Sequence, residues 1–451
     1  MRCYFLWSPL WAVAFFGLAL SACGGKANNG AAQALPAAAQ RNSSSGKIQH
    51  IVIVIQENRS FNNLFYGFPG ATTSTYGYTS TGKQVTLGPV PLEAKWDVEH
   101  DSSGYFAACN GTGSIPGTNC QMNGFDKERA GCVRSCPSYP MYAYVPHSET
   151  KPLFAIGKQY VLADQMYESN FDASSFVSHQ YIIAGQSESA VNYPLSSSWG
   201  CPGGSGDTIS MVGPQRQIPK GSEVVCWDPT TLGDELDNAG ISWAFYTSSV
   251  NGGNGGIWSA YQAIDHIYNG QDWNKDIITP QTNFFNDVSN GKLRAVNWIT
   301  PTFGNSDHPG TGSNTGPAWV ASIVNAIGQS KYWDSTAIFI FWDDYGGWYD
   351  AEPPAYVDYD GLGIRVPLLI VSAYAKRGHV THKQYEHGTI LKFVEQTFGL
   401  PAMAQSDSRA NPPDDAFNFN QAPRKFKTIK SPLGEDYFLR QPLDLRPPDT
   451  E

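Results

Sequence analysis

The stretch Ile51-Val52-Ile53-Val54-Ile55-Gln56-Glu57-Asn58-Arg59-Ser60 decides the fold. Its five consecutive β-branched apolar residues are typical of a strand that is buried on both faces, as in a parallel sheet. Polar residues follow at once, and in open α/β sheets binding sites form beyond the carboxyl ends of the strands. The stretch therefore predicts a strand of an α/β domain with functional side chains at its end.

Similar apolar runs recur along the chain and alternate with stretches of helical spacing. The further strand-like runs are Tyr160 to Ala163, Ile241 to Tyr246, Leu293 to Ile299, Thr336 to Trp342 and Val366 to Val371. The helical stretches include Phe176 to Ala184, Trp258 to Ile267, Ala318 to Ile327 and Ile390 to Phe398. This alternation predicts a doubly wound, mostly parallel sheet of buried strands sandwiched by helices, over residues 47–430, with residues 431–451 as a C-terminal tail.

Two segments, about 70–145 and 185–230, are rich in Gly, Ser, Thr and Pro and hold six cysteines. We expect loop insertions in the catalytic domain, since neither segment has the apolar periodicity for a core of its own. In an exported chain, six cysteines predict three disulfides. A zinc cluster is the alternative, although paired C-x-x-C units are absent. Six cysteines allow 15 connectivities, and the sequence leaves the choice open; a bridge between the neighbours Cys132 and Cys136 is one of them.

The N-terminus reads as an export signal. Residues 1–22 contain one early base, an apolar run and the sequence Leu20-Ser21-Ala22-Cys23, which is typical of a lipoprotein signal peptide; an ordinary signal peptide is the alternative. Residues 23–46 then form a flexible tether. We expect an exported protein, anchored through lipid on Cys23 at the periplasmic or outer-membrane surface.

The charge excludes one class of partner. Without residues 1–22 the chain has 29 basic and 40 acidic side chains, a net charge of −11. Nucleic-acid binding needs a dense Lys/Arg surface, so we expect no nucleic-acid partner.

Two of the predicted strands end in oxygen donors that suit a metal ion. Ile51 to Ile55 precedes Glu57 and Asn58, and Thr336 to Trp342 precedes Asp343 and Asp344. Adjacent carboxylates in a cleft repel each other unless a cation lies between them. We therefore expect a divalent metal, with Mg²⁺, Ca²⁺, Mn²⁺ and Zn²⁺ unresolved. Helix caps or turn residues are the alternative use of these side chains.

Further candidate site residues lie after other strand-like runs. Asp307-His308-Pro309 lies beyond Leu293 to Ile299, and Ser174 and Ser175 lie where a helical pattern begins. Backbone N–H groups at a helix N-terminus favour an anion, although either serine also suits a plain N-cap. The motif G-x-S-x-G is absent, so a hydrolase nucleophile elbow is not supported.

With these stretches the chain resembles the bacterial phosphoesterase family of phospholipases C and acid phosphatases. The matching stretches are Glu57-Asn58-Arg59-Ser60-Phe61, Ala173-Ser174-Ser175-Phe176-Val177-Ser178-His179-Gln180, Asp307-His308-Pro309, Asp343-Asp344-Tyr345-Gly346-Gly347, Gly363-Ile364-Arg365-Val366-Pro367, Tyr385-Glu386-His387, Phe393-Val394-Glu395 and Phe398-Gly399-Leu400. The resemblance implies an alkaline-phosphatase-like core, hydrolysis of phosphoric esters, and a metal beside a serine or threonine nucleophile.

The resemblance also implies a role for each matching residue. Ser175 corresponds to the nucleophile that forms a phosphoserine, and His179 to the group that contacts the phosphate. His308 and His387 correspond to histidines around the phosphoryl oxygens, and either could protonate the leaving alcohol. The metal ligands implied are Glu57, Asn58, Asp343 and Asp344. Among the other histidines, His100 and His147 are weaker candidates for the cleft, whereas His50, His266, His379 and His382 are expected to be structural or exposed.

Two other functions compete with a phosphoesterase. A sulfatase on the same core lacks the C-x-P-x-R segment that matures to formylglycine, and a lipid-anchored binding protein would keep only a structural Ca²⁺ in a degenerate site. The substrate is left open between a small phosphomonoester and a phospholipid headgroup. Larger phospholipases of the family carry C-terminal β domains, whereas this chain ends about fifty residues after the predicted helix from Phe393 to Leu400. We therefore expect a phosphomonoesterase or a small-headgroup phosphodiesterase rather than a lipid-surface enzyme.

Overall fold

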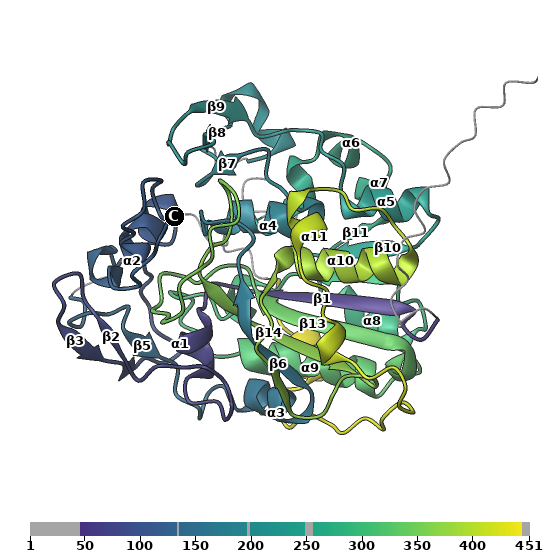
Figure 1. Ribbon diagram of the computed structural model, residues 1–451. Coiled ribbons are helices and arrows are strands. Elements are labelled where there is room, and N and C mark those ends of the chain that lie inside the picture. The colour runs from purple at the N-terminus through teal and green to yellow at the C-terminus, as the bar shows by residue number, and fades with distance from the viewer. Residues whose placement is uncertain (1–45, 133–134, 196–198, 249–255, 444–451) are drawn as a thin grey trace, which may run out of the picture. The chain divides into compact units, whose positions relative to one another are not determined.

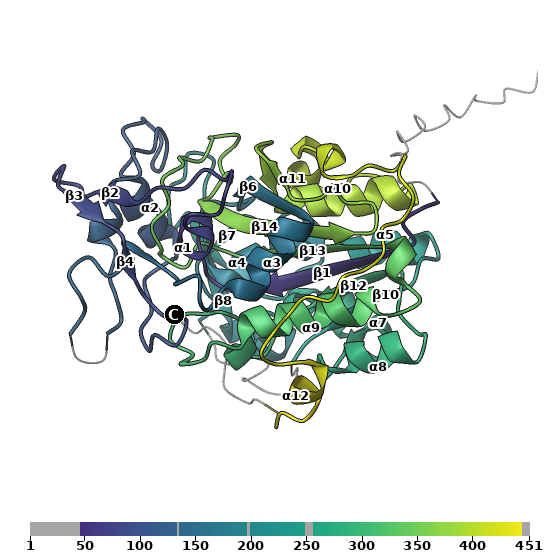
Figure 2. The same cartoon turned by 90° about the horizontal axis from the view of Figure 1, so that it is seen from below.

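One large sheet forms the centre of the fold (Figures 1 and 2). The computed structural model describes residues 46–132, 135–195, 199–248 and 256–443; the predicted signal peptide, Cys23 and nearly all of the tether lie outside these ranges. The strands of the sheet are β1 (His50–Gln56), β6 (Val161–Tyr167), β10 (Trp243–Tyr246), β11 (Ile277–Ile278), β12 (Val296–Ile299), β13 (Thr336–Trp342), β14 (Arg365–Ser372), β15 (His379–Thr381) and β16 (Tyr385–Glu386). Their order is β11-β10-β12-β1-β13-β14-β6-β15, with β16 beside β6.

Strand direction differs from the prediction at one place. β1 pairs in parallel with β12 and β13, as expected, but β14 runs antiparallel to β13 and β6. A parallel neighbour needs a crossover to the far edge of the sheet. Residues 343–364 form no helix and instead turn back at the same edge. The stretch Gly363-Ile364-Arg365 thus begins β14 at the edge where Asp343 and Asp344 follow β13.

Helices cover both faces of the sheet. Helices α8 (Asn283–Ser289) and α9 (Gly316–Gly328) lie on one face, and α10 (His387–Phe398) and α11 (Gln405–Arg409) on the other (Figures 1 and 2). α4 (Ser175–Ala184) packs beside α10. Other helices are α1 (Phe61–Phe65), α3 (Lys151–Gln159), α5 (Leu232–Asn238), α7 (Asp272–Lys275) and α12 (Glu435–Leu439). The doubly wound α/β prediction is confirmed.

One predicted helix is wrong. The stretch from Trp258 to Ile267 forms a short 3-10 turn, η4 (Ala260–Ala263), and a single helical turn, α6 (Asp265–Tyr268). Ile264 between them is extended and pairs with Trp227 in an isolated bridge. This pairing takes the backbone out of the helical conformation, so the helical spacing of the apolar residues does not give a continuous helix.

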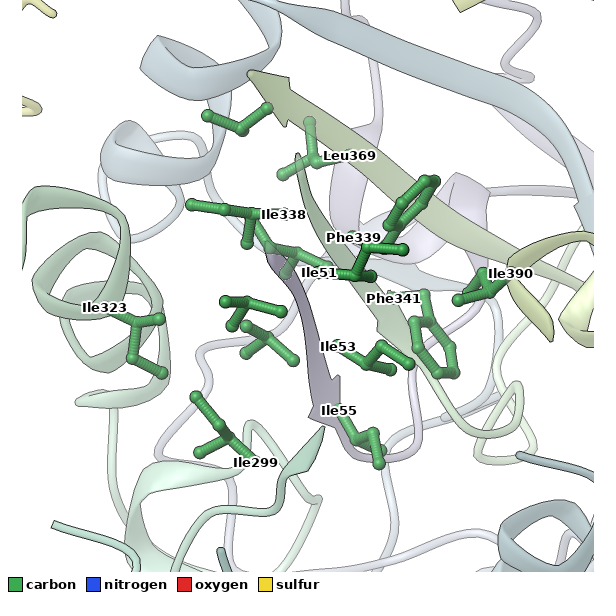
Figure 3. Close-up of a cluster of buried hydrophobic side chains, with 14 of the residues drawn as sticks. Ile51, Ile53, Ile55, Ile299, Ile323, Ile338, Phe339, Phe341, Leu369 and Ile390 are labelled. Carbon is green, nitrogen blue, oxygen red and sulfur yellow. The ribbon is translucent and has the colours of Figure 1, made fainter. Parts of the chain in front are cut away.

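The core is built from the apolar runs that predicted the strands. Figure 3 shows β1 lying between Ile323 of α9 and Ile390 of α10, with Phe339 and Phe341 of β13 beside it. These side chains are buried, and each contributes roughly 1.5–3 kcal/mol by leaving water. The sheet is therefore a rigid base for the loops at its edge.

The two insertions carry the disulfides. Cys109 pairs with Cys120, Cys132 with Cys136, and Cys201 with Cys226, which confirms the prediction of three bridges. The first insertion holds α2 (Ser102–Cys109), β2 (Tyr76–Tyr78), β3 (Gln84–Thr86), β4 (Gly88–Pro89) and β5 (Ala143–Tyr144). The second holds β7 (Ala190–Val191), β8 (Thr208–Met211) and β9 (Gly221–Val224).

The C-terminal residues pack against the helices of the sheet. Phe438 of α12 is buried, and its ring centroid lies 5.2 Å from that of Trp319 in α9. Within the described ranges, no helix combines the length and the apolar character that crossing a bilayer requires.

Candidate active site

The ends of β1 and β13 are joined by backbone hydrogen bonds. Gln56 pairs with Trp342 in register, and Asp343 N–H donates to the Gln56 carbonyl at 3.0 Å. One residue further, Asn58 N–H donates to Asp343 Oδ1 at 3.1 Å, and Arg59 N–H donates to the Asp344 carbonyl at 3.0 Å. The structure thus brings the two predicted strand-end groups into contact.

A glycine turn sets the position of Asp344. Gly346 has φ +62, and a Cβ there would lie 2.2 Å from the carbonyl oxygen of Asn58. Only glycine allows this approach at a positive φ. The Gly346 N–H donates to Asp344 Oδ1 at 2.8 Å, which leaves the other carboxylate oxygen facing α4. The Asp-Asp-Tyr-Gly-Gly stretch is therefore a shaped turn beside Asn58.

Ser175 lies at the first residue of α4, opposite this turn. Its hydroxyl donates to Asp344 Oδ2 at 3.2 Å and accepts from Asn58 Nδ2 at 3.5 Å. All three side chains are buried. Ser174 holds the N-cap position, so Ser175 Oγ is available for chemistry at a helix N-terminus.

His179 lies one helical turn after Ser175 and reaches the carboxylates. Its Nε2 is 3.1 Å from Glu57 Oε1 and 3.7 Å from Asp343 Oδ2. One ligand atom from each of these three residues lies within 4.8 Å of the other two. The resemblance implied a phosphate contact for His179, whereas the geometry places it among the candidate metal ligands.

The residues present fit a divalent metal. Glu57 and Asp343 are buried carboxylates side by side with His179, and Asp343 Oδ2 accepts no hydrogen bond in the described ranges. Like charges held together away from water repel strongly unless a cation lies between them. Carboxylate oxygens with one imidazole nitrogen suit Mn²⁺ and Zn²⁺ and are compatible with Mg²⁺. Asn58 and Asp344 border the same group.

Two other clusters of potential ligands fit a metal less well. Cys201 and Cys226 lie near Asp265, but their sulfurs are joined in a disulfide and are not thiolates. The second cluster consists of Asp237, Asp272 and Asp276. The ammonium group of Lys275 lies 3.0–3.7 Å from a carboxylate oxygen of each of the three. In that cluster the lysine already balances the negative charge.

His387 lies at the start of α10 and is buried under the group. Burial lowers its pKa to about 4, although the nearby charge of Asp343 acts in the opposite direction. The imidazole is therefore neutral near pH 7. A neutral ring cannot protonate a leaving alcohol, which disfavours one of the two roles that the resemblance implied for it.

His308 lies on the loop after β12 and is also buried. Its Nδ1 is 2.5 Å from the Pro309 carbonyl and 3.8 Å from Asp97 Oδ2. The ring packs on Phe303, with centroids 5.1 Å apart. It adjoins the site through His100, whose ring centroid is 6.2 Å away.

His100, a weak candidate from the sequence, lies in the site. Its Nε2 is 2.6 Å from Asn58 Nδ2, and its Nδ1 is 2.6 Å from the Val98 carbonyl. Because a carbonyl oxygen only accepts, Nδ1 carries a proton and Nε2 accepts from the Asn58 amide. The residue comes from the first insertion, whose path over the sheet has no signal in the sequence pattern. His147 is exposed and its ring packs on Phe154 instead.

Glu168 is a second buried group that the sequence did not single out. It directly follows β6, and its Oε1 accepts from Tyr345 N–H at 2.8 Å. Burial, followed by the charge of Asp343, raises its pKa well above the usual value. A Cβ at Gly363 would lie 2.4 Å from Glu168 Oε2, so this carboxyl packs where only glycine fits. Its place after a strand-like run is the signal that could have found it.

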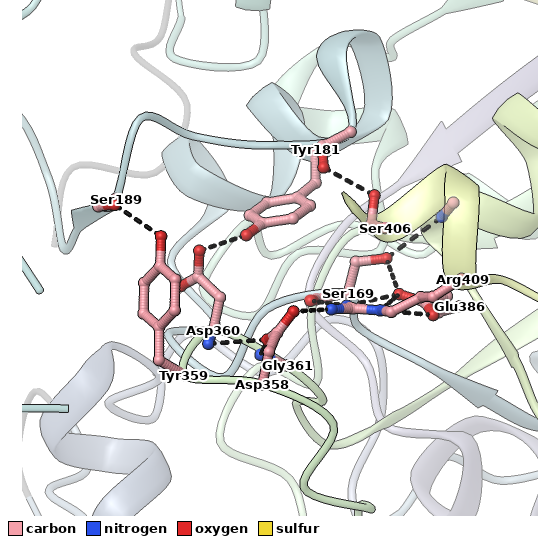
Figure 4. A network of polar contacts seen from close by, with 12 residues as sticks. Ser169, Tyr181, Ser189, Asp358, Tyr359, Asp360, Gly361, Glu386, Ser406 and Arg409 are labelled. Atoms are coloured by element: carbon pink, nitrogen blue, oxygen red, sulfur yellow. Dashed lines mark hydrogen bonds and ion pairs between the residues drawn. The ribbon is translucent and has the colours of Figure 1, made fainter. Parts of the chain in front are cut away.

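A polar network supports these residues from behind (Figure 4). Glu386, at the N-cap of α10, accepts from Arg409 Nε at 3.0 Å and from Ser169 Oγ at 2.9 Å. Tyr181 of α4 donates to Asp360 in the same network. Ser169 follows Glu168 and Glu386 precedes His387, so the network holds two buried site residues in place.

The other histidines lie outside the site, as expected. His382 pairs with Asp164 at 2.8 Å and is largely exposed, and His50 contacts the Arg294 carbonyl at 2.9 Å. His266 lies between Asp228 and Asp234 on the surface.

Comparisons with known proteins identify the family of the chain. The family model described as "Phosphoesterase family" matches residues 48–401. Phospholipase C B of Mycobacterium tuberculosis is 25% identical, with 84% of this chain and 79% of its own length aligned, and non-specific phospholipase C1 of Arabidopsis thaliana is 21% identical, with 84% and 73% aligned. A solved structure of an alkaline phosphatase superfamily protein from Vibrio parahaemolyticus aligns with 82% of this chain and 72% of its own at 11% identity and a TM-score of 0.39. The chain therefore belongs to the phosphoesterase family and is a hydrolase of phosphoric esters.

Proposed function

We propose that the protein is an exported, metal-dependent hydrolase of the phospholipase C and acid phosphatase type that acts through Ser175 and a phosphoserine intermediate. One observation carries this proposal. The hydroxyl of Ser175 is within hydrogen-bonding distance of Asp344 and Asn58, next to the buried group of Glu57, His179 and Asp343.

The metal would be held by Glu57, Asp343 and His179, with Asp344 and Asn58 at the side that faces Ser175. When bound, a divalent cation supplies Lewis acidity, which lowers the pKa of a serine hydroxyl and neutralises charge on phosphoryl oxygens. The remaining chemistry comes from the side chains of the chain itself.

Ser175 and its two neighbours set up the attack. The Ser175 O–H points to Asp344 Oδ2, so a lone pair of Oγ is left for phosphorus, and the Asn58 amide can stabilise charge on Oγ. Attack would pass the Ser175 proton to Asp344 Oδ2, form the bond from Oγ to phosphorus and break the bond from phosphorus to the ester oxygen. The N–H groups at the start of α4 would bind the equatorial oxygens, where charge develops. Water then hydrolyses the phosphoserine.

The leaving alcohol needs a proton. Burial keeps His387 neutral near pH 7, so His308 is the better candidate for this role. Its contact with the Pro309 carbonyl requires a proton on Nδ1, and the Asp97 carboxylate lies 3.8 Å from the same nitrogen. His308 therefore remains a proposed general acid.

The substrate class rests on the relatives. The matched proteins from Mycobacterium tuberculosis and Arabidopsis thaliana are named phospholipases C, and their identity to this chain is 21–25%. This supports a phosphate ester of either the small monoester or the phospholipid headgroup kind. Export and lipid anchoring rest on Leu20-Ser21-Ala22-Cys23. A Cys23→Ser variant should leave the membrane fraction for the soluble fraction, and unchanged partitioning would contradict anchoring.

A substrate panel with metal replacement tests the proposal. Chelated protein is resupplied in turn with Mg²⁺, Ca²⁺, Mn²⁺ or Zn²⁺ and is assayed with p-nitrophenyl phosphate, p-nitrophenylphosphorylcholine and phosphatidylcholine vesicles. We expect hydrolysis of at least one ester that is lost on chelation, is restored by one metal and is absent in Ser175→Ala. Full activity after chelation would contradict the metal requirement, and no hydrolysis under any condition would contradict the function.

A further inference from the structure

A tyrosine from the second insertion reaches the nucleophile. Tyr193 Oη lies 3.4 Å from the backbone nitrogen of Ser175 and accepts its N–H, and it lies 3.4 Å from His100 Nε2. We propose that Tyr193 is a substrate-contacting residue whose hydroxyl donates a hydrogen bond to a phosphoryl oxygen during the reaction. This inference rests on the proposed function, because it assumes that a phosphoryl group becomes attached to Ser175.

The position of the hydroxyl is the first argument. The Ser175 N–H belongs to the first turn of α4 and has no acceptor within the helix. A phosphoryl group on Ser175 Oγ would bring its oxygens next to this N–H, where a helix N-terminus favours anions. Tyr193 Oη already accepts this N–H and therefore lies beside the place of those oxygens. Rotation of its O–H can then direct the proton towards one of them.

The residue before Tyr193 is tied to both sides of the site. Asn192 N–H donates to Asp172 Oδ2 at 2.9 Å, and its carbonyl accepts from Ser174 Oγ at 3.0 Å. Its side-chain oxygen accepts from Ser102 Oγ at 2.6 Å, two residues after His100. Asn192 thus connects the segment that precedes Ser175 to the first insertion. These hydrogen bonds hold the backbone next to Tyr193 in place.

The ring of Tyr193 is fixed as well. Tyr193 packs against an apolar cluster that joins α4 to the second insertion and includes Phe176 and Trp199, while part of its side chain stays accessible. A donor that is held in place before substrate binds costs no reorganisation when charge develops. Tyr193 itself neither gains nor loses a proton; it only donates a hydrogen bond to an oxygen whose charge grows in the transition state.

Tyr359, in the segment between β13 and β14, contacts the same insertion and offers a matched control. The hydroxyl of Tyr359 lies 2.6 Å from Ser189 Oγ, so Tyr359→Phe also removes one phenolic hydrogen bond to this insertion. That side chain lines a different cavity, of about 440 Å³, with Tyr181 and Asp358. Loss of activity in Tyr193→Phe but not in Tyr359→Phe would separate a contact with substrate from a contact that only holds the insertion.

The experiment compares wild type, Tyr193→Phe and Tyr359→Phe on the best ester and metal from the panel. For Tyr193→Phe we expect kcat to fall by about 100-fold, as on removal of one oxyanion donor, with KM within about threefold. The inhibition constant of orthovanadate, which mimics the pentavalent phosphorus, should rise by about 10-fold or more. Metal content and circular dichroism should match wild type.

The outcomes separate the two proposals. If wild type is active and Tyr193→Phe keeps its kcat and its vanadate inhibition, the inference is overturned while the proposed function stands. Equal losses in Tyr193→Phe and Tyr359→Phe would also overturn it, because the hydroxyl would then only hold the insertion. If wild type hydrolyses no ester and binds no vanadate, the proposed function fails and the inference fails with it.

Discussion

The sheet edge and the two disulfide-bonded insertions contribute different parts of the site. Glu57, Asn58, Asp343 and Asp344 follow strands of the core and are held by backbone hydrogen bonds between β1 and β13. His100 and Tyr193 come from the insertions: His100 contacts the side-chain amide of Asn58, and Tyr193 contacts the backbone nitrogen of Ser175. Under the proposed function, the sheet edge and the start of α4 would supply the metal ligands and the nucleophile, and the insertions would contact the phosphoryl group.

The largest effect is expected at Ser175, which faces the sheet edge from α4. Ser175→Ala should lower turnover by about 10⁴-fold or more, because no other side chain replaces an activated nucleophile. Ser174→Ala removes a hydroxyl from the adjacent residue and should cost far less. Turnover, metal content and circular dichroism of both variants are the measurements. Comparable losses in the two variants would mean that turnover depends on the structure around Ser174 and Ser175 and not on Ser175 Oγ itself.

Asp344→Asn is the next test of the sheet edge. The amide keeps an oxygen for the Gly346 N–H but loses the charge that faces Ser175, so both metal occupancy and turnover should fall, turnover by about 100-fold or more. Asp237→Asn, in the surface cluster that Lys275 neutralises, is the control and should change neither. Elemental analysis measures the metal occupancy of both variants, and steady-state kinetics measures their turnover. Wild-type occupancy and turnover in Asp344→Asn would make Asp344 a plain turn residue.

His100→Ala tests the first insertion. We expect turnover to fall by about 10- to 100-fold, since Asn58 loses one of its hydrogen-bond partners, while metal content stays unchanged. His147→Ala, just after the same insertion and exposed, should stay within about twofold of wild type. A loss of metal in His100→Ala would contradict this division of roles, because a residue of the insertion would then help to hold the cation.

The second insertion can be loosened without touching the sheet. Replacing both Cys201 and Cys226 by serine opens the bridge near the segment that carries Tyr193. We expect the free energy of unfolding to fall by about 2–4 kcal/mol and turnover to fall by less than 10-fold, with metal content unchanged. Denaturation curves and kinetics measure this. Unchanged stability would show that the bridge adds nothing to the fold.

The smallest effect on activity is expected from a change within the scaffold. Burial and then the neighbouring Asp407 carboxylate raise the pKa of Glu395 in α10 to about 10. The folded state thus holds a proton that the unfolded state loses above about pH 4.5, so stability falls as pH rises from about 5 to 9. Glu395→Gln should flatten this slope, which is at most about 1.4 kcal/mol per pH unit, and leave turnover unchanged. An identical slope in the variant would contradict the pKa shift.

The fold was largely predictable because strand burial leaves a local pattern. Runs such as Ile51 to Ile55 contain only apolar residues, because both faces of the strand are buried. Such runs identify strands directly. The direction of β14 was not predictable, since it depends on whether residues 343–364 cross the sheet. The break at Ile264 was missed because it depends on pairing with Trp227, which is distant in sequence.

The site was predictable to the extent that it belongs to strand ends. Glu57 and Asp343 follow recognisable strands, and neighbouring parallel strands bring their ends together. The histidines were harder, because an imidazole in a loop has the same local sequence whether it is exposed like His147 or buried like His100. Tyr193 had no signal at all. Its place depends on Asn192, which bonds to residues from two distant segments.

The most direct test of the central claim is to trap the intermediate. Wild-type protein with its restored metal is quenched in acid during turnover of a ³²P-labelled ester, and the labelled peptide is sequenced. We predict label on the peptide that contains Ser175, located on Ser175 itself, and no label in Ser175→Ala. Label on another residue, or normal turnover by Ser175→Ala, would contradict the assignment and would favour direct attack by water.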